Sequence, residues 1–282
     1  MALSDIRGFH IVECLHEIKD GGAPTVMNDA RRHIRLVFAY AMSLGYVSKD
    51  VSAPITHRHT GVPERSRDRV LSLVEIRRLF KCMEAEREWF GRANELSLKL
   101  LLLLGVRKGE LLAARWSEFD LTARRWTIVK DRAKTKRGVI IPLPTLAVAQ
   151  LRELKVRASG SEWVIPARRR GKRHLGHVEP DTLNAALVNL PHGLEHLTIH
   201  DLRRTMRTQL SALGVRPEIA ERCLNHKFPG VLGVYDQHDF FSERQVALSL
   251  WASVLETLDR KGLDEAKALY GSAEIVPLRS AV

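Results

Sequence analysis

Residues 200–205 read His200-Asp201-Leu202-Arg203-Arg204-Thr205. His200 and Arg203 are three positions apart, so at the start of a helix their side chains lie on one face, one turn apart. Arginine presents a planar fork of donors that suits two phosphate oxygens, and histidine titrates near neutral pH, which suits proton exchange at the same group. The stretch therefore predicts a helix whose first turn can hold a phosphate.

A second histidine and a tyrosine follow downstream. His226 ends the run Cys223-Leu224-Asn225-His226, and Tyr235 comes nine residues later. A phenol is a weak nucleophile in water, but fixed positive charges beside it stabilise its oxyanion. Attack by that oxygen on phosphorus would leave a covalent phosphotyrosine.

Two upstream segments offer further positive charge. The apolar run Leu100–Leu104 predicts a buried helix stopped by Gly105, with Arg107 at the turn into the next helix and Glu110 orienting that turn. Further along, a basic turn separates two short strand patterns and contains Lys134 and Lys136. We therefore expect lysines at the tip of a hairpin.

Taken together, six residues resemble the catalytic signature of the tyrosine recombinases, the phage-integrase family of site-specific DNA recombinases, in both order and spacing. They are Arg107, Lys134, His200, Arg203, His226 and Tyr235. The resemblance covers about residues 70–260. It implies a mainly α fold with a small antiparallel β-sheet, in which a helical core-binding domain precedes an α+β catalytic domain.

The expected domain organisation rests on this resemblance and on the linker and helix-start signals in the sequence. Residues 1–60 are expected to form a helical core DNA-binding domain, truncated as if its first helices were absent, and 61–70 a linker rich in charge and poor in apolar periodicity. The catalytic domain is expected at 71–262, opening on a Ser72–Glu75 capping box, and a C-terminal tail at 263–282.

The resemblance also implies a role for each site residue. Tyr235 is the expected nucleophile, and Arg107 and Arg203 stabilise the charge that builds on the phosphate. His200 and His226 assist proton transfer or hold a phosphate oxygen. Lys134 is expected to protonate the departing 5′ oxygen, with Lys136 as the alternative, because residues two apart on a strand share a face. No metal, ATP or other cofactor is expected.

Composition points to a polyanionic partner. Lys and Arg number 45 against 33 Asp and Glu, which gives a formal net charge of +12. We expect double-stranded DNA as the partner, bound by a homo-oligomer, a tetramer by family resemblance. The residues expected to contact DNA are Arg31, Arg32, Arg35, Lys136, Arg168, Arg169, Arg170 and Arg173. The alternative for each is that it belongs to an ordinary solvated basic surface and does not contact DNA.

Other features favour a cytoplasmic protein without a membrane span. No apolar run reaches the length of a transmembrane helix, and the first residues lack the pattern of a secretion signal. The three cysteines, Cys14, Cys82 and Cys223, are far apart and in no metal-binding spacing.

Helical and strand patterns can also be placed in finer detail. A helix from Thr25 to Gly45 is expected to bury a face that includes Val37 and Phe38, and Phe240–Leu258 to bury one that includes Val246. Glu162–Pro166 is expected to be one more short strand.

Two other functions remain open at this point. A tyrosine-using DNA topoisomerase shares the chemistry but needs only one duplex, and a non-catalytic DNA-binding relic would fit the short amino-terminal region. Each residue also has a structural explanation, such as an arginine that satisfies helix carbonyls or a tyrosine at the edge of a core. Those separate explanations do not account for the joint order.

Overall fold

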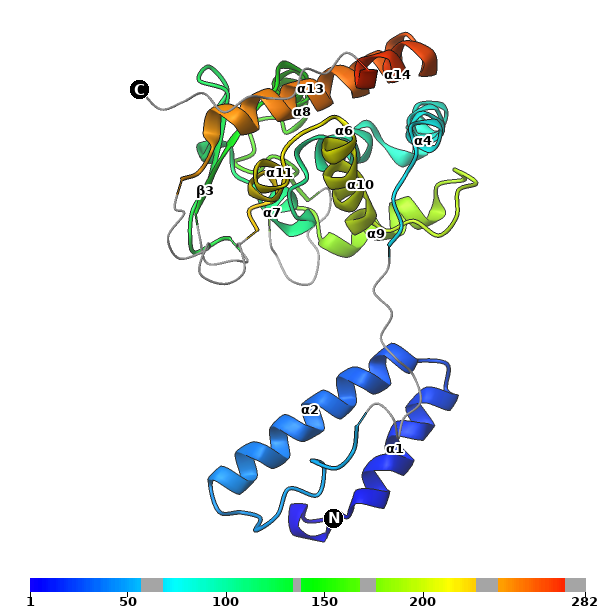
Figure 1. The fold of residues 1–282 in the computed structure, drawn as a ribbon, viewed down its shortest axis with the longest axis vertical. Coiled ribbons are helices and arrows are strands. Elements are labelled where there is room, and N and C mark those ends of the chain that lie inside the picture. The colour runs from blue at the N-terminus through cyan, green and yellow to red at the C-terminus, as the bar shows by residue number, and fades with distance from the viewer. Residues whose placement is uncertain (57–67, 134–137, 168–175, 227–237, 272–282) are drawn as a thin grey trace. The chain divides into compact units, whose positions relative to one another are not determined.

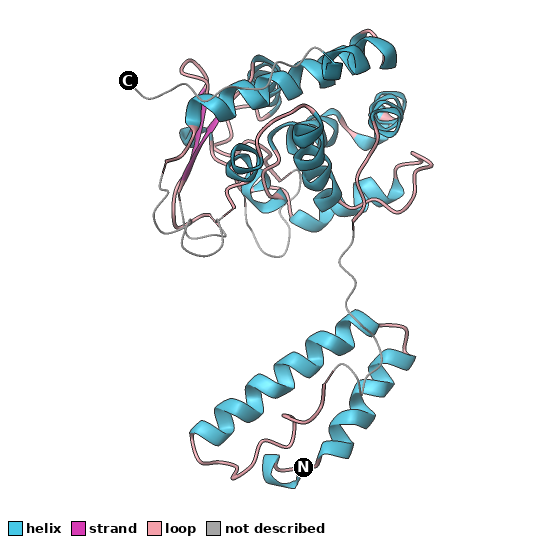
Figure 2. Cartoon of the chain, in the orientation of Figure 1, coloured by secondary structure: helices cyan, strands magenta, loops and turns pink. Residues whose placement is uncertain are grey.

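The computed structural model describes residues 1–56, 68–133, 138–167, 176–226 and 238–271. The chain divides into two compact units, Met1–Arg67 and Asp68–Val282. Helices dominate both, and the second unit also holds a three-stranded antiparallel sheet (Figures 1 and 2). The expected fold class, mainly α with a small antiparallel sheet, is confirmed.

The first unit is a pair of helices with a small core. It contains η1 (Leu3–Asp5), α1 (Gly8–Asp20) and α2 (Pro24–Ser43). Proline suits the first helical position because the amide it lacks has no partner there, and this places the start of α2 at Pro24. The buried core comprises Ile11, Leu15, Met27, Phe38 and Ile55.

One face of α2 differs from the expectation. Phe38 is buried, but Val37 is 54% exposed. Adjacent helical residues point about 100° apart. The face of α2 that packs on α1 therefore buries Phe38 and leaves Val37 open to solvent.

The second unit is built around a helix that is buried nearly all round. That helix is α6 (Arg92–Leu104). Its neighbours from distant parts of the chain include α8 (Thr145–Arg157), α10 (Ile199–Ala212) and α13 (Phe241–Arg260). Leu98 and Leu100–Leu104 are each at most 1% exposed. An apolar surface on every side requires a helix to lie inside a core rather than on it, so α6 is the centre of this unit.

Shorter elements surround α6. They are α4 (Leu73–Ala85), α5 (Arg87–Phe90), α7 (Lys108–Leu112), η2 (Trp116–Glu118), α9 (Pro180–Asn189) and α11 (Pro217–Cys223). The predicted capping box begins α4, because the Glu75 amide donates to Ser72 Oγ at 3.3 Å and the Ser72 amide donates to Glu75 Oε2 at 2.9 Å. Both bonds satisfy amides that the first helical turn leaves without partners.

The sheet has the order β1 (Phe119–Asp120), β2 (Arg125–Ile128), β3 (Val139–Pro142). Trp126 pairs with Ile141 across β2 and β3 and is fully buried. The expected strand at Glu162–Pro166 is wrong, since only the isolated bridges Arg115–Trp163 and Pro166–His177 form there. Arg115 and His177 lie outside any named strand, so no continuous ladder can develop.

Two carboxyl-terminal helices close over the core. The indole of Trp251 in α13 is buried and donates from Nε1 to the Leu102 carbonyl of α6 at 3.0 Å. Val246, expected on the buried face, is 52% exposed instead. Residues placed by the sequence in the tail form α14 (Leu263–Gly271), whose Ala266 is fully buried.

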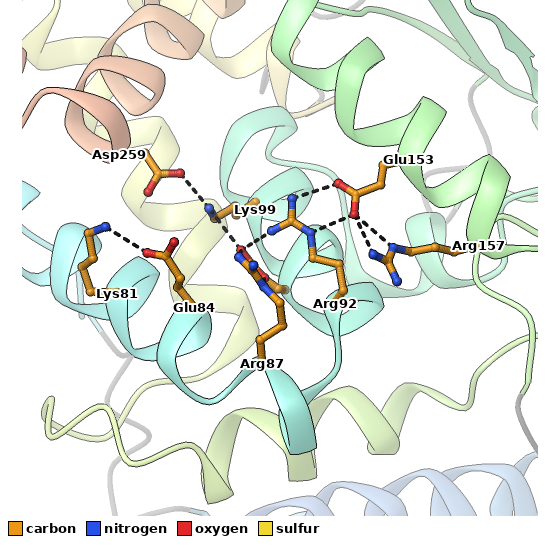
Figure 3. Close-up of polar contacts among 9 residues, drawn as sticks. Lys81, Glu84, Arg87, Arg92, Lys99, Glu153, Arg157 and Asp259 are labelled. Atoms are coloured by element: carbon orange, nitrogen blue, oxygen red, sulfur yellow. Dashed lines mark hydrogen bonds and ion pairs between the residues drawn. The ribbon is translucent and has the colours of Figure 1, made fainter.

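A dense ion-pair network holds α5, α6, α8 and α13 together (Figure 3). Its centre is the fully buried Glu95, which accepts from Arg87 at 2.9 Å, Arg92 at 2.5 Å and Lys99 at 3.3 Å. Arg92 also pairs with Glu153 at 2.8 Å, and Lys99 with Asp259 at 2.7 Å. Burial alone would raise the pKa of Glu95, but its cationic partners outweigh that effect and lower it.

Candidate active site

The first part of the site is the link between α6 and α7. Gly105 ends α6 with φ +61°, a left-handed conformation that glycine adopts without strain. Arg107 follows as the residue that caps α7. Its backbone amide donates to Glu110 Oε2 at 2.9 Å and its guanidinium to Glu110 Oε1 at 3.0 Å. The nearly buried Glu110 therefore holds Arg107 in place, as its spacing predicted.

The second part is the first turn of α10, which begins as the sequence predicted. The Thr198 amide and hydroxyl donate to the buried Asp201 carboxylate at 2.8 and 2.7 Å, forming a capping box. His200 is exposed, whereas Arg203 is only 5% exposed. The imidazole is thus open to solvent, whereas the guanidinium is buried.

Arg203 joins three segments of the chain. Its guanidinium donates to the carbonyl of Gly105, to the carbonyl of Leu224 at 2.5 Å, and to His226 Nε2 at 2.9 Å. Burial and the charge of Arg107 lower the pKa of Arg203 to about 10. The group therefore stays protonated at neutral pH.

The positive charges are close enough to act on the exposed histidine. Partial burial lowers the pKa of His200, and the charges of Arg204, Arg203 and Arg107 lower it further, against a smaller opposing effect of Asp201. At neutral pH this favours a neutral imidazole, a form that can accept a proton.

The third part follows α11. His226 contacts Arg203 through Nε2, while its Nδ1 lies 2.6 Å from Glu221 Oε2. The other oxygen of Glu221 accepts from Arg207 Nε at 2.7 Å. The structure thus brings Arg107, His200, Arg203 and His226 to one place.

The remaining expected residues fall into two groups. The first lies outside the described residues and comprises Lys134, Lys136, Arg168, Arg169, Arg170, Arg173 and Tyr235. In α2 of the first unit, Arg31 donates to the Ile55 carbonyl at 3.4 Å, Arg32 pairs with Asp29 at 2.6 Å, and Arg35 is exposed.

Glu221 and Arg207 were missed by the sequence reasoning. Glu221 is five residues before His226, a spacing that does not align two side chains on a regular helix. The available signal was Asn225, because asparagine tolerates the left-handed conformation that ends helices. It has φ +51° here.

No cluster of three or more His, Cys, Asp or Glu side chains suited to a metal ion occurs in the part of the chain that the structure describes. Within the same residues, no helix combines the length and apolar character needed to cross a membrane.

A cavity of about 220 Å³ lies between α4, α6, α8 and α13 and shares no residue with the Arg203 cluster.

Comparison with known proteins is consistent with this arrangement. The chain is 25% identical over 263 residues to prophage integrase IntZ of Escherichia coli, covering 91% of this chain and 62% of that protein. It is 23% identical over 273 residues to the integrase of Enterobacteria phage P4, covering 90% of this chain and 61% of that protein. The chain thus spans less than two thirds of either relative's length.

Among solved structures, the fold is similar to a lambda integrase tetramer bound to a Holliday junction. The TM-score is 0.62 at 21% identity, covering 84% of this chain and 66% of that one. The model of the phage integrase family matches residues 69–241, well over half of the 282 residues. These matches, together with the clustered arginines and histidines, establish that the chain belongs to the phage integrase family.

Proposed function

We propose that this chain is a site-specific tyrosine recombinase that cleaves and rejoins double-stranded DNA through a 3′-phosphotyrosine intermediate. One observation carries the proposal. A buried, protonated Arg203 is fixed beside His226, with the charge of Arg107 close enough to lower its pKa. Cations drawn from distant segments suit the charge that builds on a phosphodiester under attack.

The proposed reaction balances without an external energy source. The phenolic oxygen of Tyr235 bonds to phosphorus and loses its proton, with His200 assisting the transfer. The bond from phosphorus to the 5′ oxygen breaks, and Lys134, or Lys136 in the alternative assignment, protonates that oxygen. Arg107 and Arg203 stabilise the phosphate oxygens. A 5′ hydroxyl from a partner duplex then attacks the phosphotyrosine and releases Tyr235.

We also propose how the chain engages DNA. Residues 1–60 would form the core DNA-binding domain and 71–262 the catalytic domain. The solved lambda integrase is a tetramer on a Holliday junction, which supports assembly of several copies on DNA. The proposed phosphate contacts are Arg31, Arg32, Arg35, Lys136, Arg168, Arg169, Arg170 and Arg173. A cytoplasmic location stays a prediction from the sequence.

Covalent capture tests the proposal directly. A pool of duplexes with a randomised central sequence carries nicks placed so that the cleaved fragment diffuses away and traps the intermediate. We expect the parent protein to form an SDS-resistant adduct whose phosphate maps to Tyr235 by mass spectrometry. Tyr235→Phe should form none.

Tyr46→Phe is the matched control, because Tyr46 is also a tyrosine and is 73% exposed. It should form the adduct as the parent does. If the parent yields no adduct but still binds the pool, the chain is a DNA-binding relic rather than an enzyme. An adduct that survives in Tyr235→Phe would assign the nucleophile to another residue.

A further inference from the structure

The end of α11 places Glu221 beside His226 through its backbone. The Asn225 amide donates to the Arg222 carbonyl at 3.0 Å, and the His226 amide donates to the Glu221 carbonyl at 3.1 Å. With Asn225 in the left-handed conformation, these bonds form a Schellman motif. This motif turns the chain back over the last helical turn, so His226 lies against Glu221 despite the five-residue separation.

The side-chain contacts allow one tautomer of His226. Burial alone would raise the pKa of Glu221, but hydrogen bonds from Arg207 and His226 outweigh it and lower the pKa, so its ionised carboxylate can only accept. His226 Nδ1, at 2.6 Å, must then carry the hydrogen. On the other side, Arg203 can only donate, so Nε2 at 2.9 Å must accept. The neutral Nδ1–H form satisfies both contacts.

Glu221 is itself held in position. Arg207 of α10 donates from Nε to Glu221 Oε1 at 2.7 Å, and its Nη1 donates to the Ser211 hydroxyl of the same helix. Each carboxylate oxygen therefore has its own partner, and the carboxylate cannot rotate without breaking one of two charge-assisted bonds.

We propose that Glu221 is a positioning residue that fixes the tautomer and orientation of His226, so that Nε2 faces Arg203 and the scissile phosphate. The inference rests on the proposed recombinase function. When Nε2 takes up a proton, its contact with Arg203 breaks, because both groups are then donors. The imidazolium is neutralised by Glu221 from the opposite side of the ring, and Nε2 is then available to donate to a phosphate oxygen.

The test has a spectroscopic arm that needs no DNA. In the full-length protein with ¹⁵N-labelled histidine, the His226 ring nitrogens, assigned with a His226→Gln variant, report the tautomer. We expect the Nδ1–H form in the parent and a population shift toward Nε2–H in Glu221→Ala. Glu221→Asp should retain more of the Nδ1–H form than Glu221→Ala does, because a carboxylate can still only accept. Glu218→Ala is the matched control, since Glu218 lies on the same helix but pairs with Arg216.

The second arm measures the single-turnover rate of adduct formation on the nicked pool. Glu221→Ala should slow it by about 10- to 100-fold, the size expected when a reacting group is misplaced. Glu221→Asp should be slowed less than Glu221→Ala, and Glu218→Ala should match the parent. Urea midpoints within error of the parent would show that the variants remain folded.

Two results overturn the proposal: an unchanged His226 tautomer in Glu221→Ala, or an altered tautomer with an unchanged rate. If the parent forms no adduct, the recombinase function fails instead. The tautomer measurement alone then decides whether Glu221 positions His226.

Discussion

At the scale of single residues, Arg203 has a structural role besides its proposed chemical one. Its guanidinium donates to the carbonyls of Gly105 and Leu224 and also contacts His226. Buried carbonyls need donors, and a buried charge needs partners. Arg203 therefore contributes to holding the α6–α7 link and the turn after α11 together before any DNA is present.

Arg203→Lys should show how much of the structural role depends on the shape of the guanidinium rather than on its charge. A lysine keeps the positive charge, but its single nitrogen cannot span the positions of both carbonyls. We expect the free energy of unfolding to fall by about 2 to 4 kcal/mol, because a buried carbonyl loses its donor. Urea unfolding followed by tryptophan fluorescence measures this selectively, since all five tryptophans lie between residues 89 and 251.

Arg204→Lys is the matched control, because Arg204 is the next residue and is partly exposed, and it pairs with the buried Asp201 at 2.8 Å. The free energy of unfolding should fall by under about 1 kcal/mol, because a lysine can keep this single ion pair. Equal losses in the two variants would mean that the carbonyl contacts of Arg203 contribute little.

At the scale of elements, the start of α4 carries a pH-dependent contribution. The hydrogen bond from Arg69, with further bonds from Ser72, lowers the pKa of Glu75 to about 2 against the opposing effect of burial. Because the folded pKa lies below the unfolded value of 4.5, the stabilisation is present above about pH 4.5 and is lost as the pH falls toward 2.

Glu75→Gln should therefore destabilise the second unit at pH 6 and much less at pH 3. We expect a loss of about 1 to 2 kcal/mol at pH 6, discounted from the full shift because the side chain is partly exposed. Urea unfolding of both proteins at the two pH values measures the difference in the free energy of unfolding between the parent and Glu75→Gln. Glu84→Gln, which removes an exposed pair with Lys81 on the same helix, should show little change. If the free-energy difference between the parent and Glu75→Gln is as large at pH 3 as at pH 6, Glu75 does not make the pH-dependent contribution.

Local signals predicted the elements well where one residue determined a boundary. Gly105 ended α6, and Ser72 and Glu75 began α4, because each feature depends on its own helix end. Exposure was harder to predict. Val37 and Val246 fit helical spacing, yet the neighbouring elements leave both exposed.

The site was predictable to the extent that its residues stand in recognisable runs. Arg107, His200, Arg203 and His226 come together as their motifs indicated. Glu221 did not stand out, because a Schellman motif rather than helical periodicity brings it to His226. For Tyr235 and Lys134, which lie outside the described residues, the assigned roles stay predictions.

At the scale of the whole molecule, the two units differ in the apolar surface they can bury. The core of Met1–Arg67 has five buried hydrophobic residues, whereas that of Asp68–Val282 extends over α4, α6, α8, α10, α11, α13 and the sheet. Small domains bury a smaller fraction of their surface and are correspondingly marginal.

Hydrogen exchange should therefore distinguish the units. We expect amides of α1 and α2 to exchange at least about 100-fold faster than those of α6 and α10 in the full-length protein. Exchange measured by mass spectrometry on peptides from each helix tests this, with α14 as a second reference inside the larger unit. Equal protection of α2 and α6 would show that the first unit is stabilised by more than its own core.

The clamp that Arg203 forms with the carbonyls of Gly105 and Leu224 also limits how hybrids with related integrases can be assembled. A donor sequence spliced over residues 105–112 must follow the same main-chain path. It must also keep glycine at position 105, because φ is +61° there and a Cβ would lie 2.9 Å from side-chain atoms of Leu224 and Met206. A crossover point between Arg203 and Leu224 would instead pair a guanidinium from one parent with a carbonyl from the other. Exchange boundaries placed before residue 92 or after residue 241 would inherit the clamp whole from a single parent.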